Sequence, residues 1–110
     1  MLEVEVSEYI LVLTTVPDKK SGQEIAQALV NERLAACVTA TGVSESCYWW
    51  KGKISQDQEH ILFIKTKGDL YPRVEEKILE THPYEVPEII ALPLILGYGK
   101  YLDWISKETT

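Results

Sequence analysis

The chain has 110 residues, of which 45% are hydrophobic and 25% are charged, and its formal net charge is −6. This composition is typical of one globular domain over residues 1–110, large enough to bury a core without a metal ion or disulfide bonds. No more than two basic residues stand together, at Lys19 and Lys20, which argues against nucleic acid as a partner.

The sequence predicts neither a membrane span nor a secretory signal. The apolar run at residues 89–96 is far shorter than the roughly 20 residues that cross a bilayer. Residues 2–6 alternate aliphatic with acidic side chains, unlike a signal peptide, so we expect the whole chain in the mature protein. Cys37 and Cys47 form neither a CxxC motif nor a disulfide framework. We therefore expect a cytoplasmic protein with reduced thiols and no membrane contact.

The first predicted elements are a strand and a helix. Residues 9–15 form a β-rich apolar run, which Pro17 interrupts. Ser21 and Glu24 have the spacing of a capping box, and the apolar residues that follow recur at helical intervals. The pattern predicts a helix that ends at residues 34–36.

An aromatic hairpin is predicted next. Residues from Cys37 onward favour a strand, and the sequence Tyr48-Trp49-Trp50 leads into residues 51–53, which read as the tip of a hairpin. Because successive strand residues point to opposite faces, the two tryptophans must point in opposite directions. Residues 61–66 predict another strand.

The remainder predicts a helix, a strand and a short closing helix. Asp69 is the expected N-cap of the helix, and His82 ends it because it precedes a proline. The predicted apolar face of this helix comprises Leu70, Val74, Ile78 and Leu79. Residues 88–96 predict a strand in which Pro93 indicates an edge or a bulge, and residues 101–105 a short helix. The order is that of an α+β, ferredoxin-like βαββαβ sandwich with an extended aromatic hairpin and a C-terminal helix.

The predicted strands are apolar on both faces, which is unexpected for a monomer of this fold. Over residues 89–96, both sets of alternating side chains are hydrophobic. The two main helices of a βαββαβ sheet cover one face, and a short C-terminal helix is too small to hide all of the other. We therefore expect self-association through sheet faces or edges; the alternative is a doubly wound monomer with helices on each side.

A candidate metal-binding segment lies at residues 82–88. His82, Glu85 and Glu88 offer an imidazole and two carboxylates, which suit divalent cations, in a segment stiffened by two prolines. Further ligands would have to come from elsewhere in the fold or from a neighbouring subunit. Alternatively, His82 caps the helix C-terminus, while Glu85 and Glu88 are solvated or paired.

Catalytic chemistry has little support in the sequence. The chain lacks the GxSxG, Walker, GxGxxG and HExxH motifs. The clustered acid–base candidates are His82, Tyr84, Glu85 and Glu88, the same segment, so we expect no enzyme and assign no catalytic residue. Residues 48–50 could stack a ligand, but packing in a core or interface is the preferred interpretation.

Several segments together resemble one family, the CutA divalent-cation tolerance proteins. In order and spacing, they are residues 14–17 (TTVP), 32–37 (ERLAAC), 48–54 (YWWKGKI), 65–66 (KT), 82–89 (HPYEVPEI) and 101–104 (YLDW). The resemblance implies a ferredoxin-like fold, a tight homotrimer similar to PII signalling proteins, a cytoplasmic bacterial setting, and tolerance of copper and other divalent cations. Family members proposed to bind copper have a cysteine where this chain has Thr14, and a histidine and a glutamate that match His82 and Glu88.

Two functions follow from this combination. The first is a homotrimeric metal-binding or metal-responsive protein in which His82, Glu88 and Glu85 hold Cu2+ or Zn2+, with no cofactor required for folding; Thr14 supplies a hydroxyl in place of a thiolate. The second is a PII-like signalling or scaffold trimer that binds a small metabolite or a partner protein at clefts between subunits.

Overall fold

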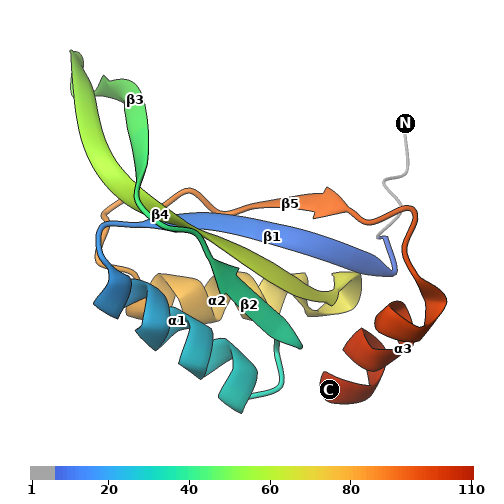
Figure 1. The fold of residues 1–110 in the computed structure, drawn as a ribbon. Helices are drawn as coiled ribbons and strands as arrows, with labels where there is room; N and C mark the ends of the chain where they lie inside the picture. The colour runs from blue at the N-terminus through green and yellow to red at the C-terminus, as the bar shows by residue number, and fades with distance from the viewer. Residues whose placement is uncertain (1–6) are drawn as a thin grey trace, which may run out of the picture.

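The computed structural model describes residues 7–110, and Figure 1 shows their arrangement. The start of the chain, where we expect no signal peptide, lies outside the described residues. The elements in order are β1 (Tyr9–Val16), α1 (Lys19–Asn31), β2 (Cys37–Ala40), β3 (Ser44–Trp50), β4 (Lys53–Lys67), a 3₁₀ turn (Gly68–Leu70), α2 (Tyr71–Thr81), β5 (Ile90–Pro93) and α3 (Gly99–Glu108). In residues 7–110, no helix is long and apolar enough to span a membrane.

One antiparallel sheet organises the chain. The strand order is β2-β4-β1-β5, and β3 pairs with the first half of β4 outside this path. The predicted hairpin arm and the predicted strand at residues 61–66 are therefore one continuous strand of 15 residues. The antiparallel sheet and three helices confirm the predicted α+β class.

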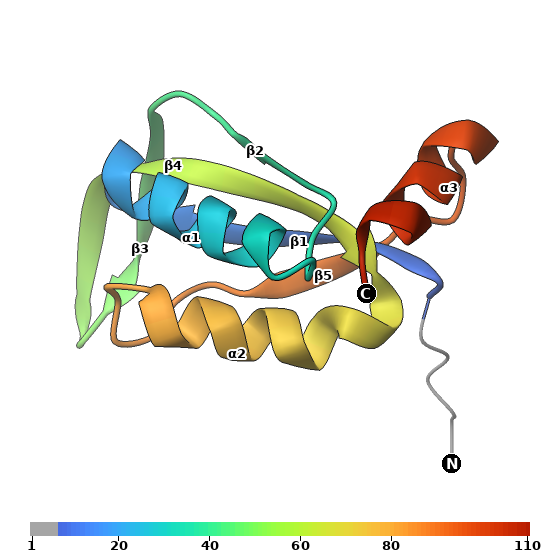
Figure 2. The same ribbon diagram turned by 90° about the horizontal axis from the view of Figure 1, so that it is seen from below.

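Helices α1 and α2 lie side by side across one face of the sheet (Figures 1 and 2). Side chains at alternate strand positions face these helices, so one set from each strand is buried. The core comprises Ile10, Val12, Val16, Leu62 and Ile64 from the sheet and Ile25, Leu29, Val74 and Ile78 from the helices. Gly22 lets α1 approach closely, because a Cβ there would lie 3.2 Å from a Val16 methyl group and 3.3 Å from a Leu62 methyl group.

Helix α1 begins and ends differently from the prediction. Its N-cap is Asp18, whose carboxylate accepts a 2.7 Å hydrogen bond from the Ser21 amide, so the predicted capping box is wrong. Its C-terminus is a Schellman motif: Arg33 has φ 56°, and the Leu34 amide donates to the Leu29 carbonyl at 2.9 Å. The helix therefore stops at Asn31, before the predicted end.

The elements around α2 also differ in detail. The 3₁₀ turn places Asp69 before the helix, and no side chain caps its start, so the predicted cap is wrong. His82 ends the helix in an extended conformation, as predicted. Leu79 is 54% exposed and does not belong to the buried face.

Strand β5 is short and lies at the edge of the sheet. Only Ile90–Pro93 pair with β1, whereas the apolar run predicts a strand over residues 88–96. Pro93 lies on the edge strand, as its missing N–H predicts. At the other end of the molecule, Lys51 (φ 50°) and Gly52 (φ 79°) form the predicted tip of the β3–β4 hairpin.

The second face of the sheet is not covered by α1 or α2 (Figure 1), and its apolar side chains range from half-buried to exposed. By alternation it carries the apolar side chains Leu11, Leu13, Ile61, Phe63, Ile90 and Leu92, which we call the open face. Helix α3 packs beside the end of the sheet, where the Tyr9 and Ser106 hydroxyls lie 2.6 Å apart (Figure 1). The doubly wound alternative is wrong for the described residues, because α1 and α2 share one face.

Two buried threonines provide a matched test of core packing. Thr14 and Thr66 are both fully buried, but Thr66 donates to the Leu34 carbonyl at 2.6 Å, whereas Thr14 Oγ1 has no hydrogen-bond partner within residues 7–110. We expect Thr14→Val to raise the free energy of unfolding by about 1 kcal/mol, because it removes an unpaired polar atom. Thr66→Val should lower it by about 1–3 kcal/mol, because it leaves a carbonyl unpaired.

Denaturant unfolding of both variants measures the difference. Equal destabilisation by the two substitutions would mean that Thr14 Oγ1 is paired in solution.

Candidate functional site

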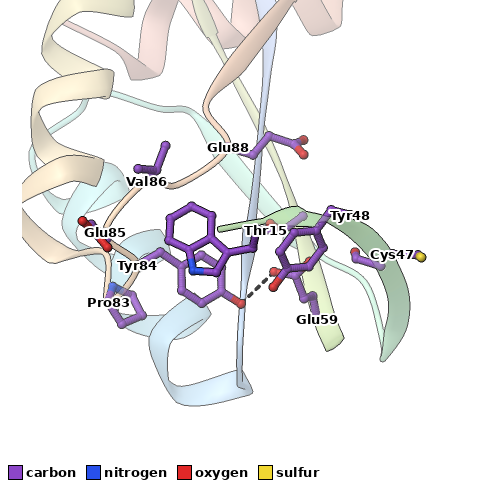
Figure 3. Close-up of a pocket in the computed structure, with 11 residues that line it drawn as sticks. Thr15, Cys47, Tyr48, Glu59, Pro83, Tyr84, Glu85, Val86 and Glu88 are labelled. Carbon is purple, nitrogen blue, oxygen red and sulfur yellow. Dashed lines mark hydrogen bonds between the residues drawn. The ribbon is translucent and has the colours of Figure 1, made fainter. Parts of the chain in front are cut away.

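A cleft of about 570 Å³ lies between the β3–β4 hairpin and the segment that joins α2 to β5 (Figure 3). Its lining residues are Thr15, Ser46, Cys47, Tyr48, Trp50, Glu59, Pro83, Tyr84, Glu85, Val86 and Glu88. Alternation along β3 directs Ser46, Tyr48 and Trp50 to the same side of the hairpin. Trp49 is exposed and is not part of the lining, as the predicted opposition of the two tryptophans requires.

Tyr84 and Glu59 join the two walls of this cleft. Glu59 is 6% exposed, and its Oε2 accepts a 2.7 Å hydrogen bond from the Tyr84 hydroxyl, drawn as a dashed line in Figure 3. Burial and this hydrogen bond to the carboxylate raise the pKa of Tyr84 well above its usual range. The phenol therefore stays protonated and fixes the segment against the hairpin.

A second phenol–carboxylate pair lies on the hairpin itself. The Tyr48 hydroxyl donates to the carboxylate of Asp57 on the facing strand. This hydrogen bond raises the pKa of Tyr48, with a smaller contribution from burial. Two tyrosines thus orient two acidic side chains on the same side of the hairpin.

His82 connects the segment to β1. Its Nε2 lies 2.8 Å from the Thr15 carbonyl, and its Nδ1 lies 3.0 Å from the Tyr84 amide nitrogen. The carbonyl requires a donor and the amide requires an acceptor, so we assign the neutral tautomer with the proton on Nε2. Burial lowers the pKa of His82, and the Thr15 hydrogen bond and Glu59 oppose that shift. The imidazole is therefore neutral at physiological pH.

The three predicted metal ligands do not converge on one point. Glu85 and Glu88 are exposed and line the cleft, and Glu85 Oε2 lies 4.0 Å from Lys51 Nζ. His82 is not among the residues that line the cleft, and both of its ring nitrogens form hydrogen bonds within the protein. Across residues 7–110, no group of three His, Cys, Asp or Glu residues is arranged to hold a metal ion. One chain alone therefore offers an incomplete ligand set.

Thr14 lies apart from the cleft. It is fully buried on the side of β1 that faces the helices, whereas its neighbour Thr15 lines the cleft. The position at which the resemblance implies a copper ligand is thus part of the core.

Sequence reasoning missed Glu59 and Asp57. Both follow the hairpin tip on β4, where their register with Ser44 and Ser46 places them opposite the small polar residues of β3. Residues 55–60 are all polar, so the sequence indicates a solvated strand there and does not single out Asp57 or Glu59. The pairing of these two carboxylates with two tyrosines depends on tertiary structure and has no local sequence signature.

The buried, neutral state of His82 has a pH-dependent consequence. Because its pKa is lowered in the folded state, the unfolded chain binds the proton more readily, and the contribution to stability falls as the pH drops below about 6.5. We expect the stability difference between the native protein and His82→Gln to shift in favour of the variant as the pH drops from neutral. Urea unfolding at several pH values measures this, and an NMR titration midpoint for His82 at or above 6.5 would contradict it.

Comparison with known proteins gives a consistent result. The sequence model of the CutA1 divalent ion tolerance protein family matches residues 10–108. The chain is 46% identical over 99 residues to the divalent-cation tolerance protein CutA of Thermus thermophilus, covering 90% of this chain and 96% of that protein. It is 44% identical over 100 residues to the chloroplastic protein CutA 1 of Oryza sativa, covering 91% of this chain and 56% of that relative. The chain thus spans about half the length of the plant relative.

Solved structures agree with this comparison. The crystal structure of CutA1 from the psychrotrophic bacterium Shewanella sp. SIB1 has a TM-score of 0.92 and 43% identity, covering 96% of this chain and 98% of that chain. The structure of the Thermus thermophilus protein has a TM-score of 0.90 and 44% identity, with 93% and 99% covered. With its family match, its relatives and its fold in agreement, the chain belongs to the CutA1 divalent ion tolerance protein family.

Proposed function

We propose that this chain acts in the response to copper and other divalent cations as a homotrimer of ferredoxin-like subunits, similar in architecture to PII proteins. The observation that carries the proposal is the cleft, which places the carboxylates of Glu59, Glu85 and Glu88 from two distant segments around one opening. Carboxylate oxygens are suitable ligands for divalent cations, and a net charge of −6 attracts them. The function is binding, with no catalytic step.

His82, Glu85 and Glu88 are the proposed metal ligands within one chain. The Nε2–H of His82 donates to a backbone carbonyl, an arrangement that commonly orients metal-binding histidines, so the lone pair of Nδ1 is the ligand atom. A metal ion held at Nδ1 would take the place of the Tyr84 amide, which donates to this nitrogen in the structure. A neighbouring subunit supplies the ligands that one chain lacks. The suitable ions are Cu2+ and Zn2+, because a tight copper(I) site needs soft sulfur ligands.

Calorimetric titration with Zn2+ and Cu2+ tests the metal site. We expect saturable binding that weakens at least tenfold in His82→Ala, because the nitrogen ligand is lost, and that also weakens in Glu88→Gln. His60→Ala is the matched control, since His60 lines a different cleft between α1 and β2. Affinity that is indifferent to His82→Ala would remove the site.

The second candidate is a signalling or scaffold trimer that binds a small metabolite or a partner protein in its clefts. Both ring nitrogens of His82 already form hydrogen bonds within the protein, which favours this candidate over a metal site. The cleft itself is lined by phenols, an indole and carboxylates. These groups recognise organic ligands as readily as ions.

Assembly is proposed through the open face. Its aliphatic and aromatic side chains would remain in contact with water in a single chain, which is unfavourable for a patch of this kind. The proposed setting is the cytoplasm, in keeping with two unpaired cysteines. A relative from Archaeoglobus fulgidus is described as periplasmic.

Two exposed leucines give a matched test of assembly. Leu92 is 49% exposed on the open face, and Leu79 is 54% exposed on α2. We expect Leu92→Glu to shift the mass in solution from a trimer to a monomer, because it places a charge in the apolar contact. Leu79→Glu should leave the trimer intact. Light scattering at micromolar concentration gives the mass, and a monomeric native protein would exclude this mode of assembly.

A further inference from the structure

The cleft combines aromatic faces with carboxylates. Tyr48, Trp50 and Tyr84 contribute rings, and Glu59, Glu85 and Glu88 contribute acidic groups. A ring face attracts a cation through its quadrupole, and a carboxylate provides a charged acceptor for an N–H donor. This combination is suited to an organic ammonium group, which has both a positive charge and alkyl surface.

An ammonium group of the protein already lies near two residues that line the cleft, Trp50 and Glu85. Lys51 Nζ lies 5.6 Å from the centre of the Trp50 ring and 4.0 Å from Glu85 Oε2. Both side chains of this ion pair are largely exposed, so the pair is weak and a ligand can replace it. The Lys51 side chain is itself an alkylammonium group, and its contacts show how such an ion can bind at the outer part of the cleft.

A second acceptor lies deeper. Glu59 is more than nine-tenths buried, and the Tyr84 hydroxyl satisfies one of its carboxylate oxygens. The other oxygen, Oε1, makes no hydrogen bond within the described part of the chain, and the side chain lines the cleft. Thr14 Oγ1 is the one buried side-chain oxygen without a partner in residues 7–110, so Glu59 Oε1 keeps contact with the solvent of the cleft. A cationic donor in the cleft would form a charge-assisted hydrogen bond with this oxygen.

Tyr84 spans the interval between these two positions. Its backbone is adjacent to Glu85, and its hydroxyl reaches Glu59, as Figure 3 shows. The Tyr84 side chain therefore leads from the backbone beside Glu85 to the inner acceptor, Glu59. A short alkyl chain can cross that interval along the aromatic walls.

We propose that the cleft binds a linear aliphatic diamine, with one ammonium group between Trp50 and Glu85 in place of Lys51 Nζ and the other at Glu59. The alkyl chain lies against Tyr84. The proposal concerns the same cleft as the metal site, but it rests on Trp50, Lys51 and Glu59 and requires no metal ion. The volume of about 570 Å³ lies within the range of small-ligand sites.

Calorimetric titration of the full chain, in its native assembly and with a chelator present, tests the proposal with 1,4-diaminobutane and 1-aminobutane. We expect one diamine per chain, bound at least tenfold more tightly than the monoamine, because two ammonium groups find carboxylates. Equal affinity for the two probes, or no binding of the diamine, would overturn the proposal.

Matched variants locate the ligand. Trp50→Leu should weaken diamine binding at least fivefold, whereas Trp49→Leu, on the other side of the hairpin, should change it less than twofold. Lys51→Gln should strengthen binding two- to fivefold by removing the internal competitor, and Lys53→Gln should leave it unchanged. Because Lys51 is exposed, its variant tests the proposal even where a tryptophan variant folds poorly. Weaker diamine binding by Lys51→Gln would contradict the proposed replacement of Lys51 Nζ by an ammonium group of the ligand.

Titration with Zn2+ separates the two proposals for this cleft. Diamine binding without metal binding leaves the present proposal intact and removes the metal site. Metal binding without diamine binding would remove the present proposal and leave the metal site intact.

Discussion

The fold of this protein depends on β4, because the two halves of this strand pair with different strands. Its second half lies between β1 and β2 and contributes Leu62 and Ile64 to the core. Its first half leaves the body of the sheet and pairs with β3 alone. Because the strand is continuous, the hairpin is held at a fixed position relative to the core, and the cleft exists where the two halves meet. Glu59 lies at this junction, which explains how a carboxylate beside an exposed hairpin is buried.

The cleft is stabilised by hydrogen bonds that connect three separate parts of the chain. Tyr84 links the segment after α2 to β4, and His82 links the same segment to the end of β1. The shifted pKa values follow from this arrangement, because burial disfavours the charged forms of both rings. A neutral imidazole and a protonated phenol leave the acidic groups as the charged elements of the cleft. Its electrostatic preference is therefore for cations, whether inorganic or organic.

Much of the fold could be predicted from the sequence, but most of the site could not. The alternation of apolar residues and the glycine at the hairpin tip are local signals, and they predicted the α+β class, the hairpin and the opposition of Trp49 and Trp50. Helix boundaries were less predictable because Asp18 and Ser21 are both acceptable N-cap residues, and in the structure the Ser21 amide donates to the Asp18 carboxylate. The segment at residues 82–88 was identified from its chemistry, but its hydrogen bonds to Thr15 and Glu59 connect residues that are distant in sequence.

The position of β1 in the sheet has a consequence for biosynthesis. β1 leaves the ribosome before both of its partners, β4 and β5, and β5 ends only at Pro93. Until β5 has been synthesised, the apolar side chains of β1 lack some of the neighbours that shield them. The sheet must then close through contacts between residues far apart in sequence, which is a slow route. The nascent chain is therefore expected to depend on chaperones or rapid translation more than a helical protein of equal length would.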